Sequence, residues 1–204
     1  MPIQNLKKDN PLKIFPCSGT LVIIDLEYTS WRGSARRKWN KRSERREIVQ
    51  IGLVKVNAKN FEVLEKICLY VRPENSFRLS RYFVVLTKIN RKVLLKKGIR
   101  FRSAVKKMKK IIPSNSLVIF NGSDGEVLRE NCKFKGVPFR FDLNLFRNFR
   151  PLLSRQLNLP ESKLVSGNLP SLLKINKKTL LHDALNDCLS ISSSLKYLRS
   201  TKKI

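Results

Sequence analysis

Acidic residues are scarce in this chain. Only 15 of its 204 residues are Asp or Glu, against 43 Lys and Arg, which gives a formal net charge of +28 at pH 7. A chain with this imbalance usually meets a polyanion, and nucleic acid is the commonest one. The charge therefore favours a nucleic-acid partner, with a ribosome-associated structural protein or binding to an anionic membrane surface as the alternatives. Charge alone does not separate binding from cutting.

Long hydrophobic runs and paired cysteines are also lacking. The longest apolar runs have four to five residues, as at 21–24, far short of the ~20 that span a bilayer. The N-terminal segment has no apolar core of the signal-peptide type. Cys17, Cys68, Cys132 and Cys188 lie far apart with no C-x-x-C pair, which favours free thiols over disulfides or a zinc site. These absences predict a cytoplasmic protein without a membrane partner.

The composition predicts a single domain. At 42% hydrophobic, 204 residues suffice for one core and are too few for two comfortable ones. Residues 1–17 read as an irregular lead-in that prolines interrupt, and 18–204 as the domain. Within it, 31–47 is basic and lacks an apolar period, so we expect an insertion loop there.

The order of elements predicts a mixed α/β fold. Three apolar segments, 20–27, 48–56 and 61–71, predict an antiparallel meander of strands. Helices are expected at 80–89 and 103–112, with Ser80 and Ser103 as N-caps. The remaining expectations are a strand at 117–120, a helix at 125–135, a strand around 139–143, and helices near 149–157, 169–175 and 183–198.

The first strand ends in two carboxylates. Alternate residues of a strand point to the same side, so Asp25 and Glu27 project together while Leu26 faces the other layer. Two neighbouring buried carboxylates repel one another unless a cation holds them, and hard oxygen ligands suit Mg²⁺ or Mn²⁺. The alternative is an exposed acidic strand edge.

Two later segments carry further polar candidates. Asp124 follows the strand at 117–120, where it could also be a plain helix N-cap. His182, the one histidine, lies five residues before Asp187 at the start of the last helix. We expect Asp187 to reach inward one turn into that helix, and Asp183 to be its N-cap or a surface residue rather than a ligand.

These three pieces together resemble the DEDDh family of 3′–5′ exonucleases, over residues 18–198. The shared pattern is D-x-E on the first strand, Asp after a later strand, and H-x-A-x-x-D on the last helix. The segments 27–29, 46–52 and 79–89 are similar to the ERI-type and oligoribonuclease/RNase T-like branch. One departure is Lys88, where such proteins often have Gly.

The resemblance implies an RNase H-like fold, with a mixed five-stranded sheet flanked by helices. It further implies that Asp25, Glu27, Asp124 and Asp187 hold two divalent ions, Mg²⁺ or Mn²⁺, and that His182 is the general base. The implied substrate is a single-stranded 3′ end, RNA favoured, from which 5′-mononucleotides are released. A DNA proofreading or repair exonuclease and a non-catalytic nucleic-acid-binding module remain alternatives.

The basic loop and its surroundings are the expected substrate contacts. The residues are Tyr28, Thr29, Arg32, Arg36, Arg37, Lys38, Arg42, Arg45 and Arg46. Trp31 and Trp39 either stack on an unpaired base or pack against the domain. Lys106, Lys107, Lys109 and Lys110 offer further phosphate contacts. The size of the charge predicts a longer or structured substrate, such as RNA within a ribonucleoprotein.

Overall fold

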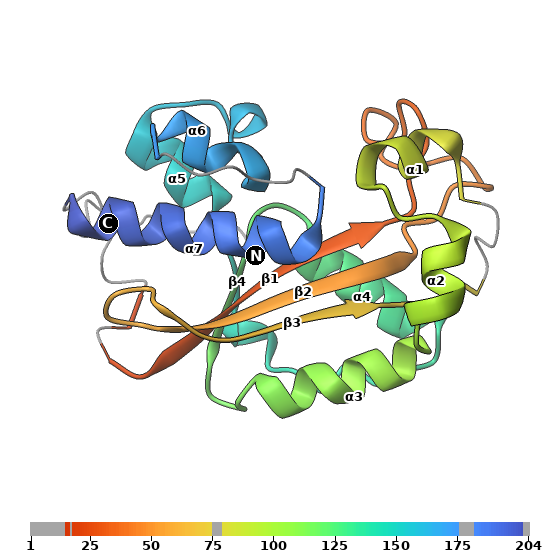
Figure 1. The fold of residues 1–204 in the computed structure, drawn as a ribbon, viewed down its shortest axis with the longest axis horizontal. Coiled ribbons are helices and arrows are strands. Elements are labelled where there is room, and N and C mark those ends of the chain that lie inside the picture. The colour runs from red at the N-terminus through yellow and green to blue at the C-terminus, as the bar shows by residue number, and fades with distance from the viewer. Residues whose placement is uncertain (1–14, 17, 75–78, 176–181, 202–204) are drawn as a thin grey trace.

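The computed structural model describes residues 15–16, 18–74, 79–175 and 182–201 (Figure 1). Most of the lead-in predicted at 1–17, Cys17 included, lies outside these ranges. Of the helices within them, none is both long and apolar enough to cross a bilayer.

The core of the fold is a five-stranded sheet in the order β3-β2-β1-β4-β5. The first three strands form an antiparallel meander, β4 runs parallel to β1, and β5 runs parallel to β4. The predicted mixed sheet is therefore confirmed. The strands are β1 (Thr20–Tyr28), β2 (Ile48–Asn57), β3 (Val63–Tyr70), β4 (Leu117–Phe120) and β5 (Phe146–Asn148).

Helices cover both faces of the sheet (Figure 1). One face packs on α3 (Phe101–Ile111) and α4 (Asp124–Phe134), and the other on α5 (Arg150–Leu157), α6 (Leu169–Leu172) and α7 (Ala184–Ser200). Alternate residues of β1 point to opposite faces of the sheet, so this strand contributes to the cores on both faces. Val22, Ile24 and Leu26 join the core with α3 and α4, whereas Leu21 and Ile23 join the core with α7.

Two short helices link the meander to α3. They are α1 (Arg81–Thr87) and α2 (Arg91–Lys97), and α2 was not expected from the sequence. As predicted, the Ser80 hydroxyl accepts a hydrogen bond from the Phe83 N–H, at 3.0 Å. The predicted N-cap at Ser103 is wrong, because α3 already begins at Phe101. Phe101 belongs to the buried stripe of this helix, together with Ala104, Val105 and Met108.

The strand predicted around 139–143 is also wrong. The edge strand β5 comes later, at Phe146–Asn148. Phe139 and Phe141 alternate as strand residues do, but they are partly buried and their rings pack against Phe146, at centroid distances of 5.8 and 5.7 Å. Aromatic packing without sheet pairing thus produced the strand-like pattern.

Candidate active site

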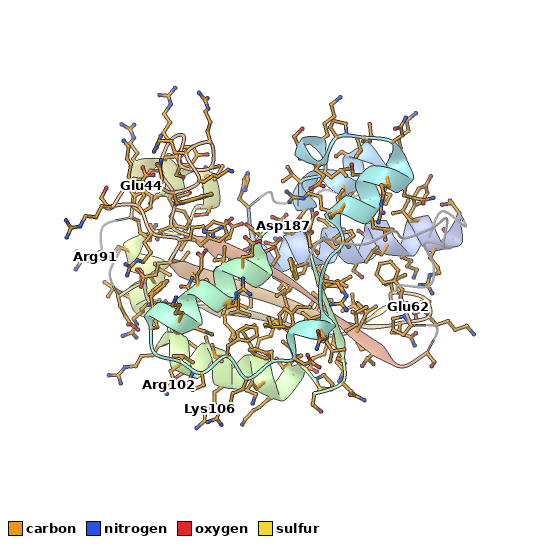
Figure 2. All side chains as sticks on the ribbon, turned by 180° about the vertical axis from the view of Figure 1, so that it is seen from behind. Glu44, Glu62, Arg91, Arg102, Lys106 and Asp187 are labelled. Carbon is orange, nitrogen blue, oxygen red and sulfur yellow. The ribbon has the colours of Figure 1, made fainter. Side chains whose placement is uncertain are left out.

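Three of the predicted carboxylates meet at the carboxyl end of β1. Asp25, Glu27 and Asp187 each present an oxygen, and these oxygens lie within 4.8 Å of one another. Asp25 and Glu27 share the α7-facing side of β1, and Asp187 lies in the first turn of α7. Figure 2 shows Asp187 between the lobe that carries Glu44 and the layer of α5 and α6. Asp124, at the start of α4, lines the same cleft but is outside this close group.

Strand β2 brings α7 to the acids. Gly52 pairs with Asp25 across the β1–β2 ladder, and a Cβ atom at Gly52 would lie 2.2 Å from the carbonyl oxygen of Ala184. Only glycine permits so close an approach, so the first turn of α7 can lie directly on the sheet. Gly52, the glycine of the 46–52 segment, is therefore required for the position of α7 at the site.

A chain of hydrogen bonds orients Asp25, and the sequence analysis did not anticipate it. Arg150 Nε donates to Asn121 Oδ1, at 2.9 Å, and Asn121 Nδ2 donates to Ser166 Oγ, at 3.1 Å. The Ser166 hydroxyl donates in turn to Asp25 Oδ1, at 3.1 Å. Ser166 begins a short 3-10 helix, Ser166–Asn168, that carries no recognisable motif, so only the tertiary structure reveals its role.

The buried acids are mutually repulsive. Burial, reinforced by the neighbouring negative charges, raises the pKa values of Asp25 and Glu27 well above their ordinary range. Burial raises the pKa of Asp124 to about 7 although Arg150 opposes the shift, and burial also raises the pKa of Asp187 to about 7. The ionised cluster therefore lacks a sufficient counter-charge from the described protein groups.

The donor set fits a divalent metal ion. Asp187 Oδ1 is buried and makes no hydrogen bond to any described residue, so one oxygen of the cluster is left without a partner. Buried polar atoms are normally satisfied. A hard cation bound by Asp25, Glu27 and Asp187 would satisfy this oxygen and relieve the repulsion.

His182 lies beside the acids. It lines the same cleft, is half-buried, and precedes α7 with a left-handed backbone, φ 59°. Burial lowers the pKa of its imidazole. Asp183 is the N-cap, as predicted, because its Oδ1 accepts a hydrogen bond from the Asn186 N–H, at 3.0 Å.

Aromatic rings surround the mouth of the cleft, whose volume is about 440 Å³. Trp39 packs edge-on against Tyr28, with centroids 5.7 Å apart, and its indole Nε1 donates to the Thr29 carbonyl oxygen, at 3.3 Å. Both tryptophans line the cleft and are only half-buried, so each has a packed side and an open side. Tyr82 of α1 also lines the cleft, a contributor that the sequence analysis missed.

Some residues of the basic loop are bonded to other protein groups, and others are exposed. Arg37 pairs with Glu44, at 2.5 Å, and Arg46 pairs with Glu130, so both guanidinium groups already have protein partners. The hydroxyl of buried Thr29 donates to the Arg45 carbonyl oxygen and accepts from the Glu47 N–H, so it holds the loop. The exposed cations of the predicted contact set are Arg32, Arg36, Lys38, Arg42 and Arg45.

Comparisons with known proteins agree with this architecture. The sequence model of the Exonuclease (RNase_T) family matches residues 22–192. The "Probable 3'-5' exonuclease KapD" of Bacillus subtilis (strain 168) is 31% identical over 140 residues, which are 65% of this chain and 65% of KapD. The match thus spans just under two thirds of that relative's length.

Two solved structures show the same fold. The nuclease domain of 3'hExo, described as a DEDDh family member bound to rAMP, superposes with a TM-score of 0.76 at 20% identity, over 90% of this chain and 93% of that one. Exonuclease I of E. coli in complex with ssDNA superposes with a TM-score of 0.67 at 17% identity, over 90% of this chain and 41% of that one. Because the family model spans most of the chain, and its acidic residues follow the DEDDh order, this protein belongs to the RNase T exonuclease family.

Proposed function

We propose that this protein is a metal-dependent 3′–5′ exonuclease that hydrolyses phosphodiester bonds at single-stranded 3′ ends and releases 5′-mononucleotides. The observation that carries the proposal is the acidic cluster of Asp25, Glu27 and Asp187, which has one buried oxygen without a partner and opens into a cleft that His182 also lines. A phosphodiester is an anion, so an uncompensated acidic cluster would repel it. The same cluster loaded with cations attracts it.

The residues have distinct proposed roles. Asp25, Glu27, Asp124 and Asp187 would hold two divalent ions, Mg²⁺ or Mn²⁺. When bound, such ions supply an activated water and neutralise the charge that develops on the leaving 3′ oxygen. His182 accepts the proton of the attacking water as general base. The lowered pKa of His182 keeps its imidazole neutral, and so able to accept a proton, at pH 7.

The cleft favours unpaired nucleotides. Trp31, Trp39 and Tyr82 are aromatic residues on which unpaired bases can stack, whereas bases inside a paired stack have both faces covered. RNA is the favoured substrate because the 46–52 and 79–89 segments are similar to the exoribonuclease branch, and because the 3'hExo structure holds rAMP. The exonuclease I structure holds ssDNA, so DNA is the second candidate substrate.

Digestion of end-labelled RNA and DNA oligomers with Mg²⁺ or Mn²⁺ tests the proposal. We expect a ladder that shortens from the 3′ end, with RNA degraded faster than DNA. Asp25→Ala should abolish digestion and leave binding at low salt nearly intact, whereas Glu126→Ala, at an exposed position of α4, should leave both unchanged. Digestion by Asp25→Ala, or binding without any digestion by the wild type, contradicts the proposal.

A cytoplasmic location accompanies this function. Cys68, Cys132 and Cys188, the cysteines within the described ranges, are free thiols, and two of them are buried. Free thiols in these numbers suit a reducing compartment.

A further inference from the structure

One stretch of the chain places many cations on the surface of the protein. Helices α2 and α3 and the link between them, residues 91–110, contain ten Lys and Arg and no Asp or Glu. All ten side chains are exposed. We call this set the α2–α3 basic surface: Arg91, Lys92, Lys96, Lys97, Arg100, Arg102, Lys106, Lys107, Lys109 and Lys110.

The α2–α3 basic surface lies away from the cleft. Asp25 and Glu27 project from β1 toward the α7 layer, whereas α3 packs on the opposite face of the sheet. None of the described residues that line the cleft comes from α2 or α3. Figure 2 shows Arg102 and Lys106 at the edge of the molecule far from Asp187. Lys106, Lys107, Lys109 and Lys110 therefore do not line the cleft, and any phosphate contact that they make lies outside it.

The charge on α3 is unfavourable for the isolated helix. Arg102, Lys106 and Lys110 follow one another at four-residue spacing, which places like charges side by side on one helix face. The buried stripe of Phe101, Ala104, Val105 and Met108 keeps the helix on the sheet in spite of this repulsion. A polyanion laid along the exposed face would turn the repulsion into attraction.

The chemistry of this surface selects a nucleic-acid backbone rather than unpaired bases. The one aromatic residue of 91–110, Phe101, is buried, so these residues themselves offer no ring on which a base can stack. The neighbouring Tyr70 is half-buried, and the Lys97 ammonium group lies 5.5 Å from its ring centroid. Lys ammonium groups act as point charges toward phosphates and read no base sequence. Aromatic rings line the cleft, whereas α2 and α3 carry a dense set of exposed cations, so the two surfaces suit different parts of one substrate.

We propose that the α2–α3 basic surface binds the phosphate backbone of a base-paired segment while the cleft holds a single-stranded 3′ end. The proposal deepens the proposed function. Only the placement of the 3′ end in the cleft rests on that function, whereas the duplex contact stands independently of it. Double-stranded RNA is generally recognised through its shape and phosphates, which requires no base contact. A base-paired region close to the 3′ end would thus account for much of the excess positive charge.

The test is duplex binding by the full chain in EDTA, where no digestion occurs. The variant K106Q/K107Q/K109Q/K110Q removes four charges at exposed helix positions, and Gln is a good helix former. The control K59Q/K66Q/R155Q/K163Q removes four exposed charges from other elements. The probes are blunt RNA and DNA duplexes of about 20 base pairs. At moderate salt we expect the α3 variant to bind the RNA duplex at least tenfold more weakly than the wild type and the control.

The salt dependence gives a second readout. Loss of four phosphate contacts should make the slope of log K against log salt less negative by about 3–4. Should the fourfold variant fail to fold, K106Q/K110Q should show about half of this change. Three outcomes would overturn the inference. The α3 variant and the control lose duplex affinity equally, or the α3 variant keeps wild-type affinity. In the third, the protein binds vesicles of anionic lipid tightly but does not bind duplex. The RNA and DNA arms identify which duplex is the ligand.

Digestion of a single-stranded oligomer of about five nucleotides separates this inference from the proposed function. The α3 variant should digest it within twofold of the wild-type rate. If the wild type does not digest the oligomer but the α3 variant loses duplex binding, the proposed function fails and the basic surface stands. If digestion is normal and duplex binding is unaffected by the α3 substitutions, the inference about the basic surface fails and the proposed function stands.

Discussion

The side-chain amide of Gln50 donates a hydrogen bond to Asp183 Oδ2, at 2.9 Å. Its carbonyl oxygen accepts from the backbone N–H of Ala184, at 3.0 Å. A single side chain of β2 therefore holds both the N-cap of α7 and the first N–H of the helix. Because α7 carries Asp187 one turn later, Gln50 sets the position of a proposed metal ligand without touching the metal site itself.

Replacing Gln50 tests this positioning role. Gln50→Ala leaves Asp183 Oδ2 and the Ala184 N–H without these partners at a buried position, which should cost about 1–3 kcal/mol of the free energy of unfolding. It should also weaken Mn²⁺ binding by about tenfold, the low end of the effect of losing a group bonded to a ligand, because Gln50 acts on Asp187 only through the position of α7. Urea denaturation and a metal titration measure the two effects.

A helix cap far from the site provides the control for Gln50. Asn90 caps α2 by accepting a hydrogen bond from the Val93 N–H, at 3.0 Å. Asn90→Ala should lower the free energy of unfolding by about 1 kcal/mol and leave Mn²⁺ affinity unchanged. Equal metal affinities in the Gln50 and Asn90 variants would show that Gln50 contributes only to stability.

Loss of the proposed general base should separate metal binding from turnover. His182→Ala and His182→Asn should each keep Mn²⁺ affinity and lower kcat by ~10²-fold or more. Asn tolerates the left-handed backbone of position 182, so its variant controls for backbone strain. At saturating metal, the wild-type kcat should fall on acidification with a midpoint below pH 6.5, because burial lowers the pKa of His182. Unchanged rates would remove His182 from the mechanism.

The acidic cluster should make the metal-free protein less stable as pH rises. The pKa of Asp187 is about 7 in the folded protein and 3.8 for the free side chain, so between these values the folded state binds more protons. The free energy of unfolding then falls as pH rises through that window, by up to about 1.4 kcal/mol per pH unit for each such group. Asp187→Asn should flatten this fall in EDTA.

Divalent metal ions should reverse this loss of stability with rising pH. Ions that bind only the folded state raise the thermal midpoint, and they bind the ionised carboxylates. We expect Mn²⁺ to stabilise the wild type most above pH 7 and to stabilise Asp187→Asn much less. A wild-type midpoint that does not respond to Mn²⁺ or Mg²⁺ at pH 8 would contradict the assignment of the cluster as a metal site.

Lys88, where the resemblance to the exonuclease family favours Gly, should affect the stability of the protein. Lys88 is the C-cap of α1 and has a left-handed backbone, with φ 61°, a conformation that favours Gly. Lys88→Gly should raise the free energy of unfolding by about 1 kcal/mol, since it removes the cost of a Cβ atom in that conformation. Arg129→Gly, at an exposed position inside α4, should instead lower it by about 1 kcal/mol. Thermal or urea unfolding distinguishes the two signs.

Much of the site was predictable because its motifs are local. The alternation of Asp25, Leu26 and Glu27 on a strand determines that the two carboxylates share a side, whatever the rest of the fold does. In the same way, the spacing from the Asp183 cap to Asp187 determines that Asp187 lies one turn into α7. The sheet of three antiparallel strands also followed from local apolar patterns.

Contacts between distant segments were decided only by the tertiary structure. Ser166 reaches Asp25 and Gln50 reaches Asp183 across 141 and 133 positions of sequence, and neither pair leaves a periodic signal. The same holds for the basic charge. Composition established that the chain is strongly cationic, but only the packing of α3 on the face of the sheet opposite α7 separates its lysines from the cleft. Charge is a property of composition, whereas the face on which it lies depends on which side of each helix is buried.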